Sequence, residues 1–264
     1  MAISHDQIAK LFFFFLLTLC LLAPRSYAQQ IQHRNLDIAE LQPGTNQHEF
    51  AFARLMYNGN DLEGWGPRWQ VDWPEAETHL VQGLSRLTRL NSNPDGVILD
   101  LTDDALFDYP WLYAVEVGSL SLNQFEAERL REYLLRGGFL MVDDFHGPSQ
   151  WSNFAYAMEK VFPDRRIENI PSDDSIFEIV YDIEEHKQIP GMRAHLSGRT
   201  WERGGRIARW RGIRDDDGRI MIAINFNMDL GDAWEHADWP EYPQNYSALA
   251  YRFAINYVLY SMTH

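Results

Sequence analysis

The sequence has almost no cysteine, since Cys20 is the only one in 264 residues and lies in a strongly apolar N-terminal stretch. The rest of the chain can therefore form neither a disulfide framework nor a cysteine metal cluster. It also offers no thiolate nucleophile, which excludes cysteine-dependent catalysis for residues 29–264.

Basic residues are in deficit as well. The chain has 23 Lys and Arg against 38 Asp and Glu, and its formal net charge is −15. Affinity for nucleic acid comes mainly from Lys and Arg contacts to phosphates, which release counterions. The composition therefore excludes DNA and RNA as partners.

Only one long hydrophobic run is present, over residues 11–23, with Lys10 before it and Ser26-Tyr27-Ala28 after it. This layout predicts a secretory signal peptide over residues 1–28, cleaved after Ala28. The alternative is an uncleaved anchor, but a membrane span needs roughly 20 apolar residues. The mature chain is expected to be periplasmic or secreted and not to span a membrane. Residues 29–48 are polar and predict a surface leader, followed by a single domain over residues 49–264.

Several catalytic motifs are missing too. The sequence has no Gly-rich phosphate loop between a strand and a helix, no Gly-x-Ser-x-Gly elbow and no His-Glu-x-x-His. Ser119 follows a predicted strand in an elbow-like place, but no residue is indicated as its base.

Hydrophobic patterns of two kinds alternate along the chain. Buried strands are predicted at residues 50–57, 97–101, 111–117 and 139–142, and helices at residues 74–89, 121–136, 148–161 and 245–262. Ser121 and Gln124 are expected to cap the second helix, with Phe125 on its buried face. The alternation predicts an α/β fold with a mostly parallel sheet covered on both faces. Near the C-terminus, Asp-Gly at 217–218 predicts a hairpin that extends the sheet.

Polar side chains gather where the predicted strands end. In an open parallel sheet, ligands bind outside the carboxyl ends of the strands. The ligand-binding candidates are therefore Arg54, Tyr57, Ser119, Asp143, Asp144, His146, Asn227, Asp229 and Asp232, and the catalytic candidates are Asp143, His146 and Glu116.

The Asp143-Asp144-x-His146 group has the residue types for acid–base chemistry or for a divalent cation. The alternative is turn chemistry, with the aspartates capping the next helix. The Asp229-x-x-Asp232-x-x-Glu235 spacing also allows two interpretations. Its acids supply ligands from a loop, or they form the acidic first turn of a short helix. No cofactor is expected beyond such a divalent metal.

Arg54 interrupts an otherwise apolar strand, where an unpaired charge would be costly. It is expected to pair with Asp143 or Asp229, either as a structural ion pair or as a clamp for an anionic ligand. Glu116 is similar, an acid in a strand whose other residues fit a core.

The chain has nine tryptophans, several of them beside acidic residues. Aromatic rings next to carboxylates suit sugar binding, although tryptophan more often fills cores or interfaces. The tryptophan-rich loop between Tyr57 and Pro74 is also a candidate surface for an envelope protein partner.

A family resemblance rests on five segments in a fixed order. They are Phe52-Ala53-Arg54-Leu55-x-Tyr57, residues 106–113, the segment from Leu130 through Gly137-Gly138 to Asp143-Asp144, Val161-Phe162-Pro163-Asp164, and Asn227-x-Asp229-Leu230-Gly231-Asp232-x-Trp234-Glu235. Together they resemble the DUF4159 family. The resemblance implies a flavodoxin-like three-layer sandwich of the class I glutamine amidotransferase-like superfamily, which includes the ThuA-like proteins.

The resemblance implies no reaction, because the family has no established one. Glutamine amidotransferases use a cysteine at the elbow after the third strand, whereas this chain has Glu116-Val117-Gly118-Ser119 there. ThuA-like proteins carry a histidine in a place comparable to His146, which points towards sugar-related ligands. The leading hypothesis is an exported domain that binds a small ligand or partner protein without amidotransferase activity. The alternative is a hydrolase acting on a glycan or related small molecule, with or without a metal.

Overall fold

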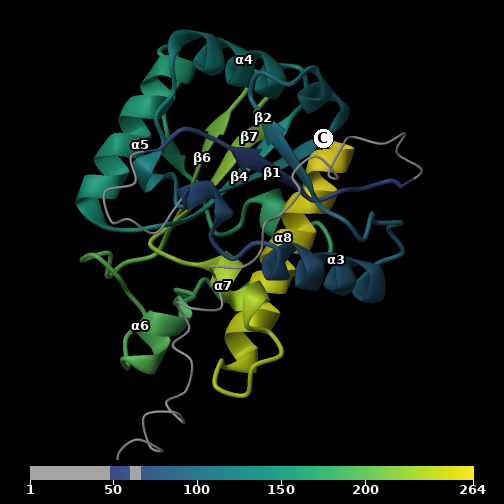
Figure 1. The fold of residues 1–264 in the computed structure, drawn as a ribbon, viewed down its shortest axis with the longest axis vertical. Coiled ribbons are helices and arrows are strands. Elements are labelled where there is room, and N and C mark those ends of the chain that lie inside the picture. Colours follow the sequence, from purple (N-terminus) through teal and green to yellow (C-terminus); the bar gives the residue numbers. More distant parts are fainter. Residues whose placement is uncertain (1–47, 60–66) are drawn as a thin grey trace, which may run out of the picture. The chain divides into compact units, whose positions relative to one another are not determined.

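The computed structural model describes residues 48–59 and 67–264, and a seven-stranded sheet lies at its centre (Figure 1). The strand order is β2-β1-β3-β4-β7-β6-β5. The strands are β1 (Ala53–Met56), β2 (Val97–Asp100), β3 (Trp111–Val115), β4 (Phe139–Phe145), β5 (Glu168–Asn169), β6 (Arg209–Arg214) and β7 (Ile220–Phe226).

Five strands of the sheet, β2, β1, β3, β4 and β7, pair in parallel. Numbered along the chain, their order is 2-1-3-4-5, which is the order of a flavodoxin-like sheet. β6 pairs antiparallel with β7, and β5 antiparallel with β6. The α/β fold and the C-terminal hairpin extension predicted from the sequence are therefore confirmed.

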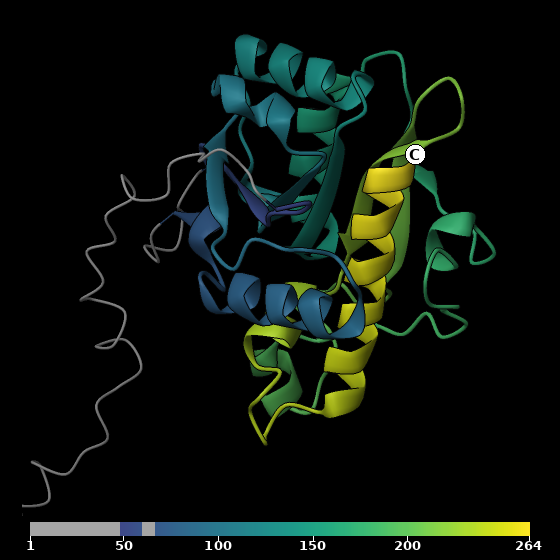
Figure 2. The same cartoon turned by 90° about the vertical axis from the view of Figure 1, so that its right-hand side faces the viewer.

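Helices cover both faces of the sheet (Figures 1 and 2). They are α3 (Glu75–Leu87), α4 (Gln124–Leu135), α5 (Gly147–Val161), α6 (Met192–Leu196), α7 (Leu230–Glu235) and α8 (Gln244–Thr263). Short 3-10 turns occur at Arg68–Gln70, Asp104–Asp108, Val117–Ser119 and Ser175–Phe177. α3 and α8 lie side by side on one face in both views, while α4 and α5 cover the other.

Strand β4 shows how the sheet separates two hydrophobic cores. Successive side chains of a strand point to opposite faces. Phe139 and Met141 pack into the core beneath α3 and α8, whereas Leu140 and Val142 pack into the core beneath α4 and α5. A fully buried parallel strand needs apolar residues on both faces, which is why this segment has no alternating pattern.

Two details of this region differ from the sequence predictions. β4 continues to Phe145, so Asp143 and Asp144 lie inside the strand and not in the loop after it. The side chain of Phe125 is 55% exposed, so it does not belong to the buried face of α4. Leu130, Tyr133 and Leu134 are buried as predicted, so Phe125, in the first turn of α4, is the one that departs.

The capping residues of α4 also differ from the predicted Ser121 and Gln124. Asn123 accepts a bond from the Glu126 amide at 2.9 Å, and the Glu126 carboxylate accepts one from the Asn123 amide at 2.7 Å. These two bonds form the capping box.

Because the Asn123 side chain satisfies a free helix amide, Asn123→Ala is expected to lower the free energy of unfolding by about 1 kcal/mol. Urea denaturation at neutral pH measures the loss. Ser121→Ala is the control and should change stability by less than about 0.5 kcal/mol. Equal losses in the two variants would contradict the assigned cap.

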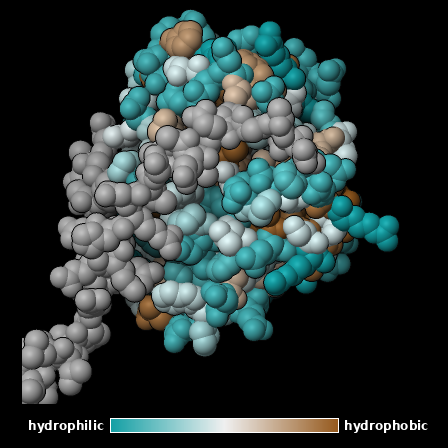
Figure 3. Space-filling view, turned by 45° about the vertical axis from the view of Figure 1, so that its right-hand side comes forward, coloured by the Kyte–Doolittle hydropathy of each residue, from teal (hydrophilic) through white to brown (hydrophobic). Residues whose placement is uncertain are grey.

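Residues 1–47 and 60–66 lie outside the described residues, and with them the predicted signal peptide, its cleavage site, Cys20 and Trp65. Within the described residues, no helix combines the length and the apolar character needed to cross a membrane. On the face drawn in Figure 3, hydrophilic side chains predominate and hydrophobic ones form small separate patches.

Candidate functional site

The carboxyl ends of β3, β4 and β7 each carry a non-glycine residue in a left-handed conformation. Glu116 follows β3 with a φ of 52°, Asp144 near the end of β4 has 47°, and Asn227 after β7 has 64°. The described chain has two others, Asp72 at 63° and Arg203 at 45°. Left-handed non-glycine residues are uncommon and strained, and they cluster where a fold holds a functional site.

Arg54 does not pair with Asp143 or Asp229, so that prediction is wrong. Its Nε donates to Glu77 of α3, and its Nη1 donates to the carbonyls of Trp69 and Val71, each at 2.9 Å. The side chain is 1% exposed. Arg54 therefore anchors α3 and the preceding loop to β1, and no part of the guanidinium faces solvent.

Tyr57 and Ser119 support the turn that carries Glu116. The Tyr57 hydroxyl donates to the carbonyls of Val115 and Glu116 at 2.8 and 2.9 Å, and Ser119 Oγ donates to the Glu116 carbonyl at 3.2 Å. Both side chains, which were predicted to bind ligand, thus form hydrogen bonds to backbone carbonyls. The residue at the elbow-like position directly after β3 is Glu116.

Glu116 itself faces Arg68, whose Nη1 donates to its Oε1 at 3.2 Å. Burial raises the pKa of Glu116, while the charge of Arg68 acts in the opposite direction. Its side chain is 14% exposed, so solvent reaches it.

Asp143 is fully buried against the start of α7. Its Oδ2 accepts bonds from the Leu230 and Gly231 amides at 2.7 and 2.9 Å, and from the Tyr113 hydroxyl at 3.2 Å. Oδ1 is buried and has no hydrogen-bond partner in the described part of the chain. Burial raises the pKa of Asp143 to about 7, although the two amide bonds lower it.

Asp144 and His146 form a hydrogen-bonded pair, with Oδ1 and Nε2 3.0 Å apart. Burial, followed by the charges of Glu116 and Glu202, raises the pKa of Asp144 well above its usual range. Burial lowers the pKa of His146. The carboxyl group therefore keeps its proton more readily than an ordinary aspartate, and the imidazole beside it takes up a proton less readily than a free histidine.

Asn227 links three segments that surround Asp144 and His146. Its Oδ1 accepts from the Gly147 amide at 2.8 Å, and its Nδ2 donates to the Ile207 carbonyl at 2.7 Å. Gly147 has a φ of 73°, and a Cβ there would meet the Arg203 carbonyl at 2.1 Å. The Asn227 side chain, predicted to bind ligand, therefore holds together the backbone segments around the site.

Asp229 and Asp232 begin the short helix α7, so the helical alternative for this acidic spacing is the one observed. Asp229 is the N-cap, and its Oδ1 accepts from the Asp232 amide at 2.8 Å. Asp232 Oδ2 accepts from the Met192 amide at 2.7 Å. Burial raises the pKa of Asp229 well above its usual range, with further increments from Asp144 and Asp232.

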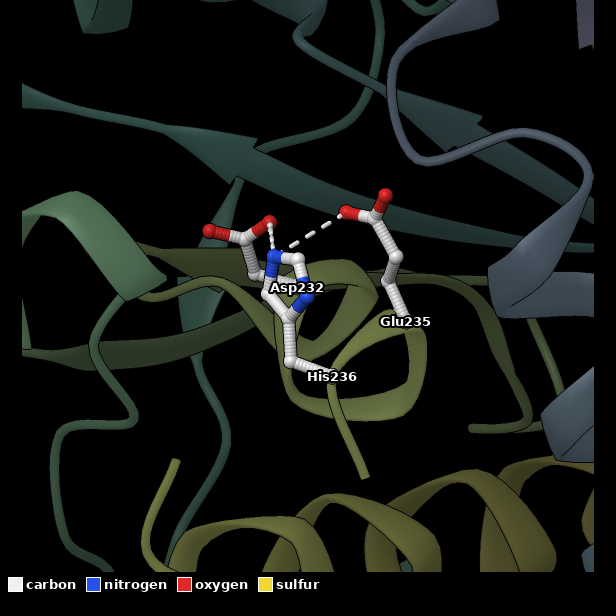
Figure 4. A group of neighbouring side chains, drawn as sticks. All are labelled: Asp232, Glu235 and His236. Carbon is white, nitrogen blue, oxygen red and sulfur yellow. Dashed lines mark ion pairs between the residues drawn. The ribbon is translucent and has the colours of Figure 1, made fainter. Parts of the chain in front are cut away.

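His236 lies between Asp232 and Glu235 (Figure 4). Its Nε2 is 3.4 Å from Asp232 Oδ1 and 3.3 Å from Glu235 Oε2. Burial opposes the positive charge, but the bond to Asp232 and the charges of both carboxylates raise the pKa of His236. The same contacts with His236 lower the pKa of Asp232 in spite of its burial.

Two acidic residues of the site were missed by the sequence reasoning. Asp72, in the loop before α3, is 9% exposed, and its Oδ2 has no partner among the described residues. Glu202 lies near α7, because a Cβ at Gly191 would meet Asp229 Oδ2 at 2.6 Å, Asp232 Oδ2 at 2.9 Å and Glu202 Oε1 at 3.0 Å. In the sequence, Asp72 and Glu202 each stand as a single acid in a loop, and no motif marks either of them as part of a site.

We call Asp72, Asp143, Asp144, Asp229 and Asp232 the carboxylate cluster. The charges of the other four members all raise the pKa of Asp229, which places the five side chains in one neighbourhood. The structure thus brings together Asp143, Asp144, Asp229 and Asp232, as expected from the strand ends, and adds Asp72. Arg54 lies close to the cluster but is turned towards Glu77.

The tryptophans divide between core and surface. Trp69 and Trp234 are buried, so they fill the core, whereas Trp73 beside Asp72 is half-buried and Trp239 is exposed. Much of the predicted partner loop between Tyr57 and Pro74 lies outside the described residues.

Comparison with known proteins gives one finding. No curated protein matches the sequence. The family described as "Domain of unknown function (DUF4159)" matches residues 51–262, which include every element of the sheet and the whole carboxylate cluster. Since this match covers most of the chain, the protein belongs to the DUF4159 family.

Proposed function

We propose that this protein is an exported domain that binds a small polar ligand of the carbohydrate class at the carboxyl ends of β3, β4 and β7. One observation carries the proposal: of the five left-handed non-glycine residues of the described chain, Asp72 and Asp144 belong to the carboxylate cluster. The other three lie beside Asp144 or beside Gly147, which follows the Asp144–His146 pair, and they are Glu116, Arg203 and Asn227. This conformation costs about 1 kcal/mol or more for each of Glu116 and Arg203, whereas aspartate and asparagine adopt it more readily. The concentration of all five residues at one place favours a functional origin over a structural one.

The chemistry of the cluster favours a ligand rich in hydroxyl groups. Carboxyl groups have oxygen atoms that accept hydrogen bonds, and sugar hydroxyls are donors. The side chains of Asp144, Glu116 and Asp232 are 11%, 14% and 18% exposed, so solvent reaches this part of the site. Trp73 supplies a half-buried ring beside Asp72. The apolar run at residues 11–23 supports export.

A panel of mono- and disaccharides tests the proposal by thermal shift and calorimetry on the full-length protein. At least one sugar should bind the parent, and Asp144→Asn should weaken its affinity by about tenfold or more, because an amide replaces a carboxyl group that bonds the sugar hydroxyls. Asparagine tolerates the left-handed backbone of position 144. Glu128→Gln, on the exposed side of α4, is the matched control.

If no sugar in the panel binds the parent, or if Glu128→Gln weakens binding as much as Asp144→Asn, the carbohydrate proposal is wrong.

A second candidate function is hydrolysis of a glycan or related small molecule, favoured by the Asp144–His146 pair. A carboxyl group with a raised pKa in contact with a neutral imidazole offers a proton donor and an acceptor side by side. Glu116, at the strained turn after β3, is a further acid–base candidate. Release of product from the sugars that bind distinguishes this function from binding alone. Glutamine hydrolysis is not proposed, because residues 29–264 contain no cysteine.

The likeness to the glutamine amidotransferase-like superfamily also stays a proposal. The 2-1-3-4-5 order of the parallel strands supports it, as does the left-handed residue directly after β3, where those enzymes place their nucleophile.

A further inference from the structure

Three members of the carboxylate cluster approach one another closely enough to share a ligand. Asp72, Asp229 and Asp232 each offer one carboxylate oxygen, and these oxygens all lie within 4.8 Å of one another. The three residues come from the loop before α3, the N-cap of α7 and the first turn of α7.

The backbone holds two of these carboxylates in position. The Asp232 amide donates to Asp229 Oδ1, and the Met192 amide donates to Asp232 Oδ2. Bonds of this kind orient carboxylate ligands in known cation sites, and the oxygens keep lone pairs for a cation.

Asp72 gives an independent indication that a ligand is needed. Its Oδ2 is buried and has no hydrogen-bond partner in the described part of the chain. Gly231 makes room for this oxygen, since a Cβ there would lie 2.1 Å from it. The nearby guanidinium of Arg54 donates to Glu77 and two carbonyls through Nε and Nη1, and its buried Nη2 makes no hydrogen bond to the Asp72 oxygen. A buried carboxylate oxygen without a donor is costly unless a cation or a proton compensates it.

We infer that Asp72, Asp229 and Asp232 bind one hard divalent cation, with Ca²⁺ as the best match. The three residues supply only oxygen, which Ca²⁺, Mg²⁺ and Mn²⁺ prefer over softer metals. Ca²⁺–oxygen distances are about 2.3–2.6 Å, so two oxygens on one Ca²⁺ lie up to about 5 Å apart. All three oxygens lie within 4.8 Å of one another, a spacing that one Ca²⁺ can span.

A second group of possible ligands shares Asp232 with the first, namely Asp232, Glu235 and His236 (Figure 4). Here the imidazole nitrogen already lies between the two carboxylates, 3.4 and 3.3 Å from their oxygens. A protonated His236 balances these charges without a metal. In the Asp72 group, Oδ2 of Asp72 has no such donor among the described residues, which is why the cation is assigned there.

The inference goes beyond the proposed function, since the cation site needs no sugar. The experiment is a calorimetric titration of chelator-treated, full-length protein with CaCl₂, MgCl₂, MnCl₂ and ZnCl₂ at constant ionic strength. The parent should bind one Ca²⁺ with a dissociation constant on the order of 10⁻⁴ M, as in extracellular modules.

Asp72→Asn is the decisive variant and should lower Ca²⁺ affinity by about tenfold or more. Asparagine adopts positive φ readily, so the variant is expected to fold. Asp229→Asn is the second variant, because asparagine caps helices as well as aspartate does, and it should lose Ca²⁺ affinity similarly. Circular dichroism confirms the fold of each variant.

Two controls separate the inference from its alternatives. Glu235→Gln should keep Ca²⁺ affinity within about twofold, and Asp217→Asn in the exposed β6–β7 turn should behave like the parent. The inference is overturned if the parent shows no saturable Ca²⁺ binding, if Asp72→Asn binds like the parent, or if Glu235→Gln loses more affinity than Asp72→Asn. Running the sugar panel with and without Ca²⁺ distinguishes a failed carbohydrate proposal from a failed cation site.

Discussion

Glu77→Ala is expected to lower the free energy of unfolding by about 3–5 kcal/mol, the range for removing one partner of a buried ion pair. The side chains of Arg54 and Glu77 are only 1% and 4% exposed, so water cannot replace the missing carboxylate. Arg54 would keep its bonds to the Trp69 and Val71 carbonyls but would carry an uncompensated charge inside the fold. Urea denaturation monitored by circular dichroism measures the loss.

The double variant Arg54→Met/Glu77→Leu should recover most of this stability, because it removes both charges and leaves apolar side chains of similar size. Glu132→Ala is the control, since it breaks the exposed Glu132–Arg136 pair on α4 and should cost less than about 0.5 kcal/mol. A loss below about 1 kcal/mol in Glu77→Ala would mean that Arg54 finds another partner.

The stability of the protein in chelator is expected to fall as the pH rises from about 4 to about 7. Burial raises the pKa of Asp143 from 3.8 to about 7 in the folded state. The unfolded chain therefore loses this proton at a lower pH than the folded protein does. The stabilisation that is present below pH 4 is lost as the pH rises through 7. One such group gives a slope of about 1.4 kcal/mol per pH unit. The raised pKa values of Asp72, Asp144 and Asp229 act in the same direction, and the lowered one of Asp232 in the opposite direction.

Asp143→Asn isolates the contribution of one group. The asparagine oxygen can still accept from the Leu230 and Gly231 amides, while the titration is gone. The free energy of unfolding of the variant should fall less steeply with pH, by roughly 1 kcal/mol per pH unit. The variant should also be more stable than the parent at pH 8. Unfolding in urea at pH 5, 6, 7 and 8 measures both slopes. Asp104→Asn, whose side chain is fully exposed, should leave the slope unchanged, and an unchanged slope in Asp143→Asn would assign the pH dependence to other residues.

The sheet could be predicted from the sequence because its strands and helices have separate hydrophobic patterns. The predicted segments at 97–101 and 111–117 contain β2 and β3, and the Asp-Gly turn joins β6 to β7 as expected. Strand ends were less certain, and β4 shows why. Asp143 and Asp144 are charged residues inside a buried strand, which hydropathy alone assigns to a loop.

The candidate site was predicted in part. The strand ends correctly brought Asp143, Asp144, Asp229 and Asp232 together, because carboxyl ends of parallel strands meet at one edge of the sheet. The partner of Arg54 could not be found in this way, since Glu77 reaches it from a helix above the sheet. Asp72 was missed for a similar reason: its position depends on how the loop before α3 packs against α7.

The parallel pairing of β4 with β7 also sets the order in which the protein can fold. Leu140 of β4 lies beside Ile222 of β7, so a large part of the chain must form a loop before the two strands meet. Closing such a loop costs entropy before any contact compensates it, which slows folding. During synthesis, an N-terminal fragment that stops before α7 contains Asp143 without the amides that hold it. The carboxylate cluster therefore stays incomplete until α7 has been synthesised.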